Sequence, residues 1–128
     1  MVTQITTQLR AIAAAPDFFQ ESERLVGRWV GAGVGAEAVD DVLAFMEQHP
    51  DIDFGAPGPL AHFIERFYGS DYKTALLASL VRKPTQHTVW LLNRVINGER
   101  EPDTRSVCLA QMQQIADDPS VDDDARAC

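Results

Sequence analysis

The sequence contains few features of a membrane, secreted or metal-binding protein. Its longest apolar runs, at 11–15 and 89–92, are far shorter than the roughly 20 residues that span a bilayer. No basic stretch followed by an apolar one opens the chain, so no secretory signal is visible and we expect a cytoplasmic protein. Only two cysteines are present, Cys108 and Cys128. Neither has a second ligand at zinc spacing, and a disulfide between them is possible but not required, so we expect no metal and no cofactor.

Patterns of catalytic sites are also missing. No serine, histidine and acid occur in a recognisable nucleophile context, and the glycine–proline segment 55–60 lacks the lysine and hydroxyl of a phosphate-binding loop. The aspartates at 117–124 lack the alternating spacing and central glycine of a calcium loop. We therefore predict no catalytic residue and no enzyme activity. An enzyme that acts through His62 or His87 is a third hypothesis, and loss of an activity on replacing either would support it.

What the sequence does contain is helical periodicity over nearly its whole length. No run of alternating β-branched residues is present, and apolar residues recur three and four positions apart. Glycines and prolines separate the periodic stretches. This pattern predicts about seven short helices, at about 3–15, 17–31, 36–49, 59–69, 70–83, 84–98 and 102–118.

Short joins between these helices predict that neighbours lie antiparallel. The sequence therefore predicts one all-α domain over residues 1–128, with 119–128 as an acidic tail. Two architectures fit seven such helices: stacked helical pairs like a fragment of an α-solenoid, or a compact helical bundle. We favour the stacked pairs, because seven short helices fit a two-layer array better than a four-helix bundle. Arg94 is expected to bridge to an acid on a neighbouring helix.

Charge is strongly and unevenly acidic. Acidic residues outnumber basic ones 19 to 11, for a net charge of −8. Residues 1–49 contain seven acids and three bases and residues 101–128 contain seven and two, whereas residues 50–100 contain five and six. Such a field disfavours nucleic acid and anionic membranes as partners and favours a basic protein partner. Solubility alone is the other explanation of this charge.

Two segments carry a family resemblance. In a small acidic helical chain, GAPGPL at 55–60 and LNR at 92–94 resemble the helical immunity proteins of bacterial toxin systems, in general character over most of the chain. The resemblance implies an inhibitor with no chemistry of its own, which binds a toxin domain and covers its active site. Because nuclease toxins carry basic clefts, an acidic face would speed their association.

The residues expected to bind such a partner lie mainly on the helix predicted at 36–49. Glu37, Asp40, Asp41 and Glu47 fall on the side opposite its apolar stripe, where they are free to face a partner. Trp90 is the candidate aromatic anchor, since tryptophan is enriched at binding hot spots, with packing in the core as its alternative role.

A helical scaffold or adaptor that binds a peptide or protein subunit is the alternative function.

Overall fold

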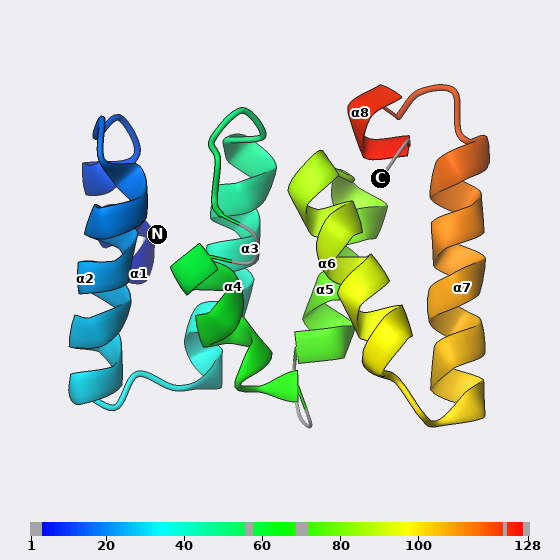
Figure 1. The fold of residues 1–128 in the computed structure, drawn as a ribbon, viewed down its shortest axis with the longest axis horizontal. Helices are drawn as coiled ribbons and strands as arrows, with labels where there is room; N and C mark the ends of the chain where they lie inside the picture. Colours follow the sequence, from blue (N-terminus) through cyan, green and yellow to red (C-terminus); the bar gives the residue numbers. More distant parts are fainter. Residues whose placement is uncertain (1–3, 56–57, 69–71, 122, 127–128) are drawn as a thin grey trace.

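A computed structural model describes residues 4–55, 58–68, 72–121 and 123–126 (Figure 1). Within these residues the chain forms seven α-helices of eight to sixteen residues and one terminal helix of four. The helices are α1 (Gln4–Ile12), α2 (Phe18–Gly31), α3 (Val39–Gln48), α4 (Gly58–Glu65), α5 (Lys73–Arg82), α6 (Gln86–Gly98), α7 (Pro102–Asp117) and α8 (Asp123–Arg126), with a 3-10 turn at Ala36–Ala38. No strand occurs in these residues, which confirms the predicted all-α fold. Ala56, Pro57 and Cys128 lie outside the described residues.

The helices stack as antiparallel pairs in two layers. α1, α3 and α5 contact one another in succession and form one layer. α2 and α4 pack together in front of it, and α6 continues this second layer by packing on α5 and α7 (Figure 1). Each of the first three pairs, α1–α2, α3–α4 and α5–α6, is also in contact within itself. This arrangement corresponds to the stacked-pair alternative.

Local sequence fixes where individual helices begin and end. Thr85 opens α6 with a capping box, in which its hydroxyl accepts from the Thr88 backbone N–H and the Thr88 hydroxyl accepts from the Thr85 N–H. The Glu101 carboxylate caps α7 by accepting from the Thr104 N–H at 2.6 Å, and Pro102 follows at the first helical position. Each cap satisfies backbone donors that the first turn of a helix leaves unpaired.

The central helix α3 is buried on more than one side, because it packs between α1 and α5 and also touches α4 and α6. Six of its ten residues are buried: Val39, Val42, Leu43, Phe45, Met46 and Glu47. An apolar stripe facing one neighbour holds three to four residues per two turns, or about four to five in a helix of this length. The core of the molecule is therefore centred on α3.

One helix is shorter than expected, and the acidic tail forms one further turn of helix. The helix predicted at 59–69 ends at Glu65, because the N–H groups of Arg66 and Phe67 turn to carbonyls only three residues back. The acidic tail predicted at 119–128 contains α8, which packs on α6 and α7 and buries Ala125 completely.

The last long helix, α7, is the least buried of the array. Among its sixteen residues only Cys108 and Ile115 are buried, and Val107 and Leu109 are exposed. Cys108 is a free cysteine and packs in the core. In the described part of the chain, no helix has both the length and the apolar character that crossing a bilayer requires.

Candidate functional site

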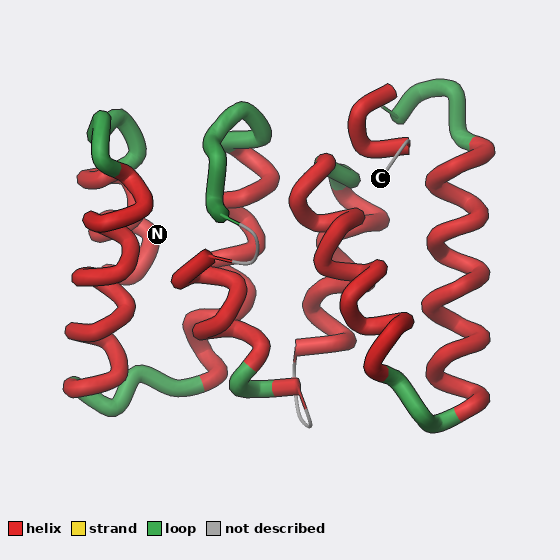
Figure 2. Tube along the Cα trace, in the orientation of Figure 1, coloured by secondary structure: helices red, strands yellow, loops and turns green. Residues whose placement is uncertain are grey.

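The up-and-down topology gathers four connections at one edge of the molecule. Odd-numbered helices run one way and even-numbered ones the other, so the described connecting residues at 13–17, 49–55, 83–85 and 118–121 share an edge (upper edge of Figure 2). The described residues of these connections include four aspartates and one lysine, namely Asp17, Asp51, Asp53, Asp118 and Lys83. We call this edge the acidic edge. The topology thus brings aspartates from segments far apart in the sequence to one edge.

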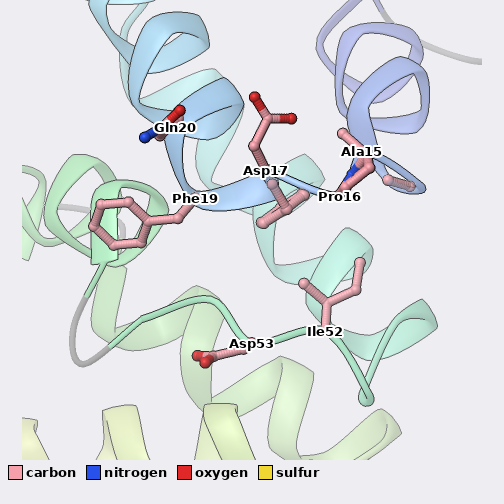
Figure 3. A pocket seen from close by; sticks show the side chains of 9 residues that line it. Ala15, Pro16, Asp17, Phe19, Gln20, Ile52 and Asp53 are labelled. Carbon is pink, nitrogen blue, oxygen red and sulfur yellow. The ribbon is translucent and has the colours of Figure 1, made fainter.

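A groove opens on the acidic edge between the first two of these connections (Figure 3). It encloses about 550 Å³. It is lined by Ala13, Ala15, Pro16, Asp17, Phe18, Phe19, Gln20, Ile52 and Asp53. Asp17 reaches it from the connection before α2 and Asp53 from the loop after α3 (Figure 3). Phe19 is 48% exposed at its border, so the groove combines two carboxylates with an accessible aromatic ring.

The backbone of one wall is fixed by Gly55. The Asp53 carboxylate accepts a hydrogen bond from the Gly55 N–H at 2.9 Å, and Gly55 adopts a φ of +93°. A Cβ atom at this position would lie 2.7 Å from the Gly58 Cα and 2.9 Å from the Phe19 ring. Only glycine tolerates both this conformation and this close approach. The Gly55 turn therefore fixes the position of Asp53. It also lets the Phe19 ring lie close to the backbone of this turn.

An aromatic cluster anchors the same loop from below. Phe54 is buried, and its ring packs edge-on against Phe18 and Phe45 at centroid distances of 5.7 and 6.1 Å. On its other side it meets His87 at 4.9 Å, and His87 in turn contacts Trp90 at 5.7 Å. These contacts join α2, α3 and α6 beneath the groove. The segments that carry the carboxylates of Asp17 and Asp53 thus pack on this aromatic cluster.

His87 is partly buried and packs in this cluster as a neutral ring. Burial lowers the pKa of His87 to about 4, and the nearby negative charges of Asp53 and Glu65 oppose this shift only in part. Its buried Nε2 has no hydrogen-bond partner among the described residues. His87 therefore resists protonation in the folded protein.

Trp90, the predicted aromatic anchor, is partly buried and packs against the core. Besides His87 it contacts the Arg94 guanidinium, which lies 5.3 Å from its ring centre. The structure therefore places Trp90 in the role that the sequence left as its alternative. The accessible aromatic ring is Phe19.

Glu47 is not free to face a partner, contrary to expectation. It is buried, its carboxylate accepts from the Ser79 hydroxyl at 2.7 Å, and Arg82 Nη2 lies 2.7 Å from the same oxygen. The side of α3 that carries Glu47 is covered by α5, which supplies both partners. The prediction failed because a helical wheel shows one apolar side but cannot show that a second neighbour covers the polar side.

The other predicted acids lie away from the groove. Glu37 and Asp40 are exposed and Asp41 is half-buried, all near the edge opposite the acidic edge, where the chain enters α3. The Glu37 carboxylate accepts from the Gly35 N–H at 3.0 Å, which lowers the pKa of Glu37. The structure thus does not bring Glu37, Asp40 and Asp41 together with Trp90.

Sequence reasoning missed Asp17, Asp53 and Phe19 as site residues. Asp17 and Asp53 are 36 positions apart and line one groove only because both connections end on the same edge. A signal for Phe19 was present in the adjacent pair Phe18–Phe19 at a helix start, since two consecutive helical residues cannot both face one core. Phe18 is buried and Phe19 is exposed.

A second polar cluster pins α6 to α5 at the opposite edge. The Glu99 carboxylate accepts hydrogen bonds from the Tyr68 hydroxyl, the Lys73 ammonium and the Glu101 N–H. These donors lower the pKa of Glu99 to about 2, with Tyr68 contributing most. The Glu99 carboxylate thus stays ionised far below the pH at which free glutamate titrates.

We expect Glu99→Gln to remove part of the acid sensitivity of folding. The folded-state pKa of Glu99 lies below its ordinary value of 4.5, so its stabilising contribution is complete above pH 4.5 and is lost as the pH falls towards 2. Urea unfolding measured at a series of pH values should show a shallower loss for the variant in this window. Glu23→Gln, at an exposed position of α2, is the matched control, and equal slopes for all three proteins would contradict the assignment.

Known proteins provide no further assignment. No family model, no curated protein and no solved structure matches this chain. Among the described residues, no three histidine, cysteine, aspartate or glutamate side chains come together as a possible metal site. The residues of the chain itself therefore carry the functional interpretation.

Proposed function

We propose that this chain is a protein-binding module without chemistry of its own, and that it acts as an immunity protein that binds and neutralises a bacterial toxin domain. The observation that carries the proposal is the groove on the acidic edge, where Asp17 and Asp53 flank an exposed Phe19. The resemblance of the segments at 55–60 and 92–94 to immunity proteins supports the same role. This role places the protein in the cytoplasm of the cell that it protects.

The chemistry of the groove specifies the partner's surface. Carboxylates attract lysine and arginine and accelerate encounter with a basic face, and an exposed aromatic ring adds contact area that excludes water. The substrate cleft of a nuclease toxin presents a basic face of this kind. Nucleic acid and anionic membranes carry the wrong sign of charge for this edge.

We favour the groove over the exposed face of α3 as the binding surface, because packing holds the loops of the groove in place. The Asp53 loop is held by the buried Phe54 and by the Gly55 turn, so its carboxylate loses little conformational freedom when a partner docks. Exposed acids on a helix face, such as Asp40, lack such support. The groove is therefore the preferred contact surface of the proposed complex.

We expect the double variant Asp17→Asn, Asp53→Asn to slow association with the toxin encoded beside this gene by about tenfold at low salt. The wild-type association rate should fall as salt is added, and the variant's rate should depend less on salt. Surface plasmon resonance or stopped-flow fluorescence would measure both rates. Asp103→Asn, on the exposed start of α7, removes a charge elsewhere and should leave the rate nearly unchanged.

The double variant Glu37→Gln, Asp40→Asn tests the surface predicted from sequence. A larger loss of association rate there than at the groove would move the interface to α3. Absence of any complex with the neighbouring toxin would contradict the immunity function. A stable partner unrelated to toxins would favour the scaffold or adaptor function instead.

A further inference from the structure

A second pocket lies at the edge opposite the acidic edge, between α4, the start of α5 and the end of α6. It encloses about 450 Å³ and shares no lining residue with the groove on the acidic edge. Its lining consists of Glu65, Tyr68, Tyr72, Arg94, Val95, Asn97 and Gly98. No described residue of the four helical connections that form the acidic edge lines it. A function of this pocket is therefore separable from that of the groove.

Tyr72 gives this pocket an unused hydrogen-bond donor. The side chain is fully buried, and its hydroxyl has no hydrogen-bond partner among the described residues. Tyr72 lines the pocket together with Glu65 and Arg94. Buried hydroxyls in native proteins nearly always have a partner, and one without a protein partner marks the place of a bound polar group.

The charges of the pocket already neutralise each other. Arg94 Nε and Nη2 donate to the two oxygens of the Glu65 carboxylate at 2.8 and 2.9 Å, which confirms the predicted bridge from Arg94 to a neighbouring helix. Burial raises the pKa of Tyr72, so the hydroxyl keeps its proton and acts as a donor. A ligand must therefore offer an acceptor to Tyr72 without adding a net charge beside the ion pair.

We propose that this pocket binds a carboxamide group, supplied by an asparagine or glutamine side chain of a polypeptide partner. The carboxamide oxygen accepts the hydrogen bond of the Tyr72 hydroxyl, and its NH₂ group donates to the Glu65 carboxylate, which has lone pairs beyond those that Arg94 uses. A carboxylate in the same position would face the negative charge of Glu65. An ammonium would face Arg94 and would leave Tyr72 without an acceptor.

Only the source of the carboxamide rests on the proposed function, since the chemistry of the pocket is independent of it. An interface needs a few well-placed polar contacts that fix its register, and a buried donor in a neutral pocket supplies one. Because an unpaired Tyr72 hydroxyl would remain buried without its ligand, the pocket discriminates against a partner that lacks the amide.

Acetamide, acetate and methylammonium are the probes that test the ligand class. Acetamide and acetate have nearly the same shape and differ in charge and in the NH₂ donors. We expect acetamide to cause saturable ¹H–¹⁵N shift changes at Tyr72, Val95 and Gly98 in the full-length protein, with binding at least tenfold weaker in Tyr72→Phe. Acetate and methylammonium at the same concentration and ionic strength should leave these resonances in place.

Three results would overturn the carboxamide site: no saturable change with acetamide, equal changes with acetate or methylammonium, or undiminished acetamide binding by Tyr72→Phe. Tyr72→Phe removes one oxygen that has no partner in the described structure, so circular dichroism and thermal unfolding should show a folded protein of undiminished stability. Asn97→Ala, at the exposed rim of this pocket, is a second variant, and it leaves the Tyr72 ring intact.

Complex formation with the neighbouring toxin separates the two proposals. Tyr72→Phe should raise the dissociation rate and leave the salt-dependent association rate unchanged, whereas the groove variant slows association. Acetamide binding without any toxin complex would retain the pocket and reject the immunity function. If Tyr72→Phe leaves the dissociation rate of the toxin complex unchanged, the toxin does not supply the carboxamide.

Discussion

Replacing Trp29 by alanine should lower the free energy of unfolding by about 4 kcal/mol, the range for truncating a buried tryptophan. Trp29 is 2% exposed and joins three helices: it lies in α2, its ring meets Phe63 of α4 at 5.2 Å, and its indole N–H donates to Gln8 of α1 at 2.8 Å. The substitution removes the packing and also leaves the Gln8 side chain without this partner. In a chain of this size, the melting temperature should fall by on the order of 10 °C.

Val30→Ala is the matched control, because Val30 follows Trp29 in the same helix and is 47% exposed. Its effect should stay within about 0.5 kcal/mol, as for most surface substitutions. Urea unfolding followed by circular dichroism measures both values. A loss below about 1 kcal/mol for Trp29→Ala would show that the contact between α2 and α4 does not depend on this side chain.

His87 should make folding sensitive to mild acid. Its folded-state pKa of about 4 lies below the ordinary value of 6.5, so the unfolded chain takes up the proton first as the pH falls. The free energy of unfolding is unaffected by His87 above pH 6.5 and decreases between pH 6.5 and 4, by about 3 kcal/mol in total. The decrease should appear as a falling urea midpoint in this window.

His87→Phe keeps a ring between Phe54 and Trp90 and removes the titrating group. We expect the variant to match or exceed the wild-type stability at pH 7, because it also eliminates a buried Nε2 without a described partner, and to lose about 3 kcal/mol less on going to pH 4. His62→Gln, at an exposed position of α4, controls for the loss of a histidine. Parallel pH profiles for wild type and His87→Phe would contradict a buried neutral ring.

Much of the fold follows from apolar periodicity and its interruptions. The stripe containing Val42, Leu43 and Met46 predicts α3, and the break at Pro50 predicts its end, whereas α1 ends at Ile12, before the position predicted from Pro16. Sequence could not predict how many neighbours each helix has. That number depends on the layer in which the helix lies, and it explains why Glu47 is buried and paired with Arg82 although it falls outside the apolar stripe.

The candidate site was less accessible to sequence reasoning than the fold. Acidic composition predicted a basic partner, and the helix at 36–49 was the most conspicuous place to look for the contact residues. The acidic edge instead depends on the direction of each helix, which places Asp17 beside Asp53. The pocket at Tyr72 was not predictable, because an unpartnered hydroxyl is a property of three-dimensional packing and leaves no pattern in the chain.

Stacking of successive pairs also bears on how the chain folds. The main contacts join helices that are at most three elements apart along the chain, as in α1 with α3, α2 with α4 and α3 with α6. Each new helix therefore closes only a short loop when it docks, and the entropy lost on closure is small. Proteins with such local contacts fold faster than those that must first pair distant segments. We therefore expect this chain to reach its folded state quickly.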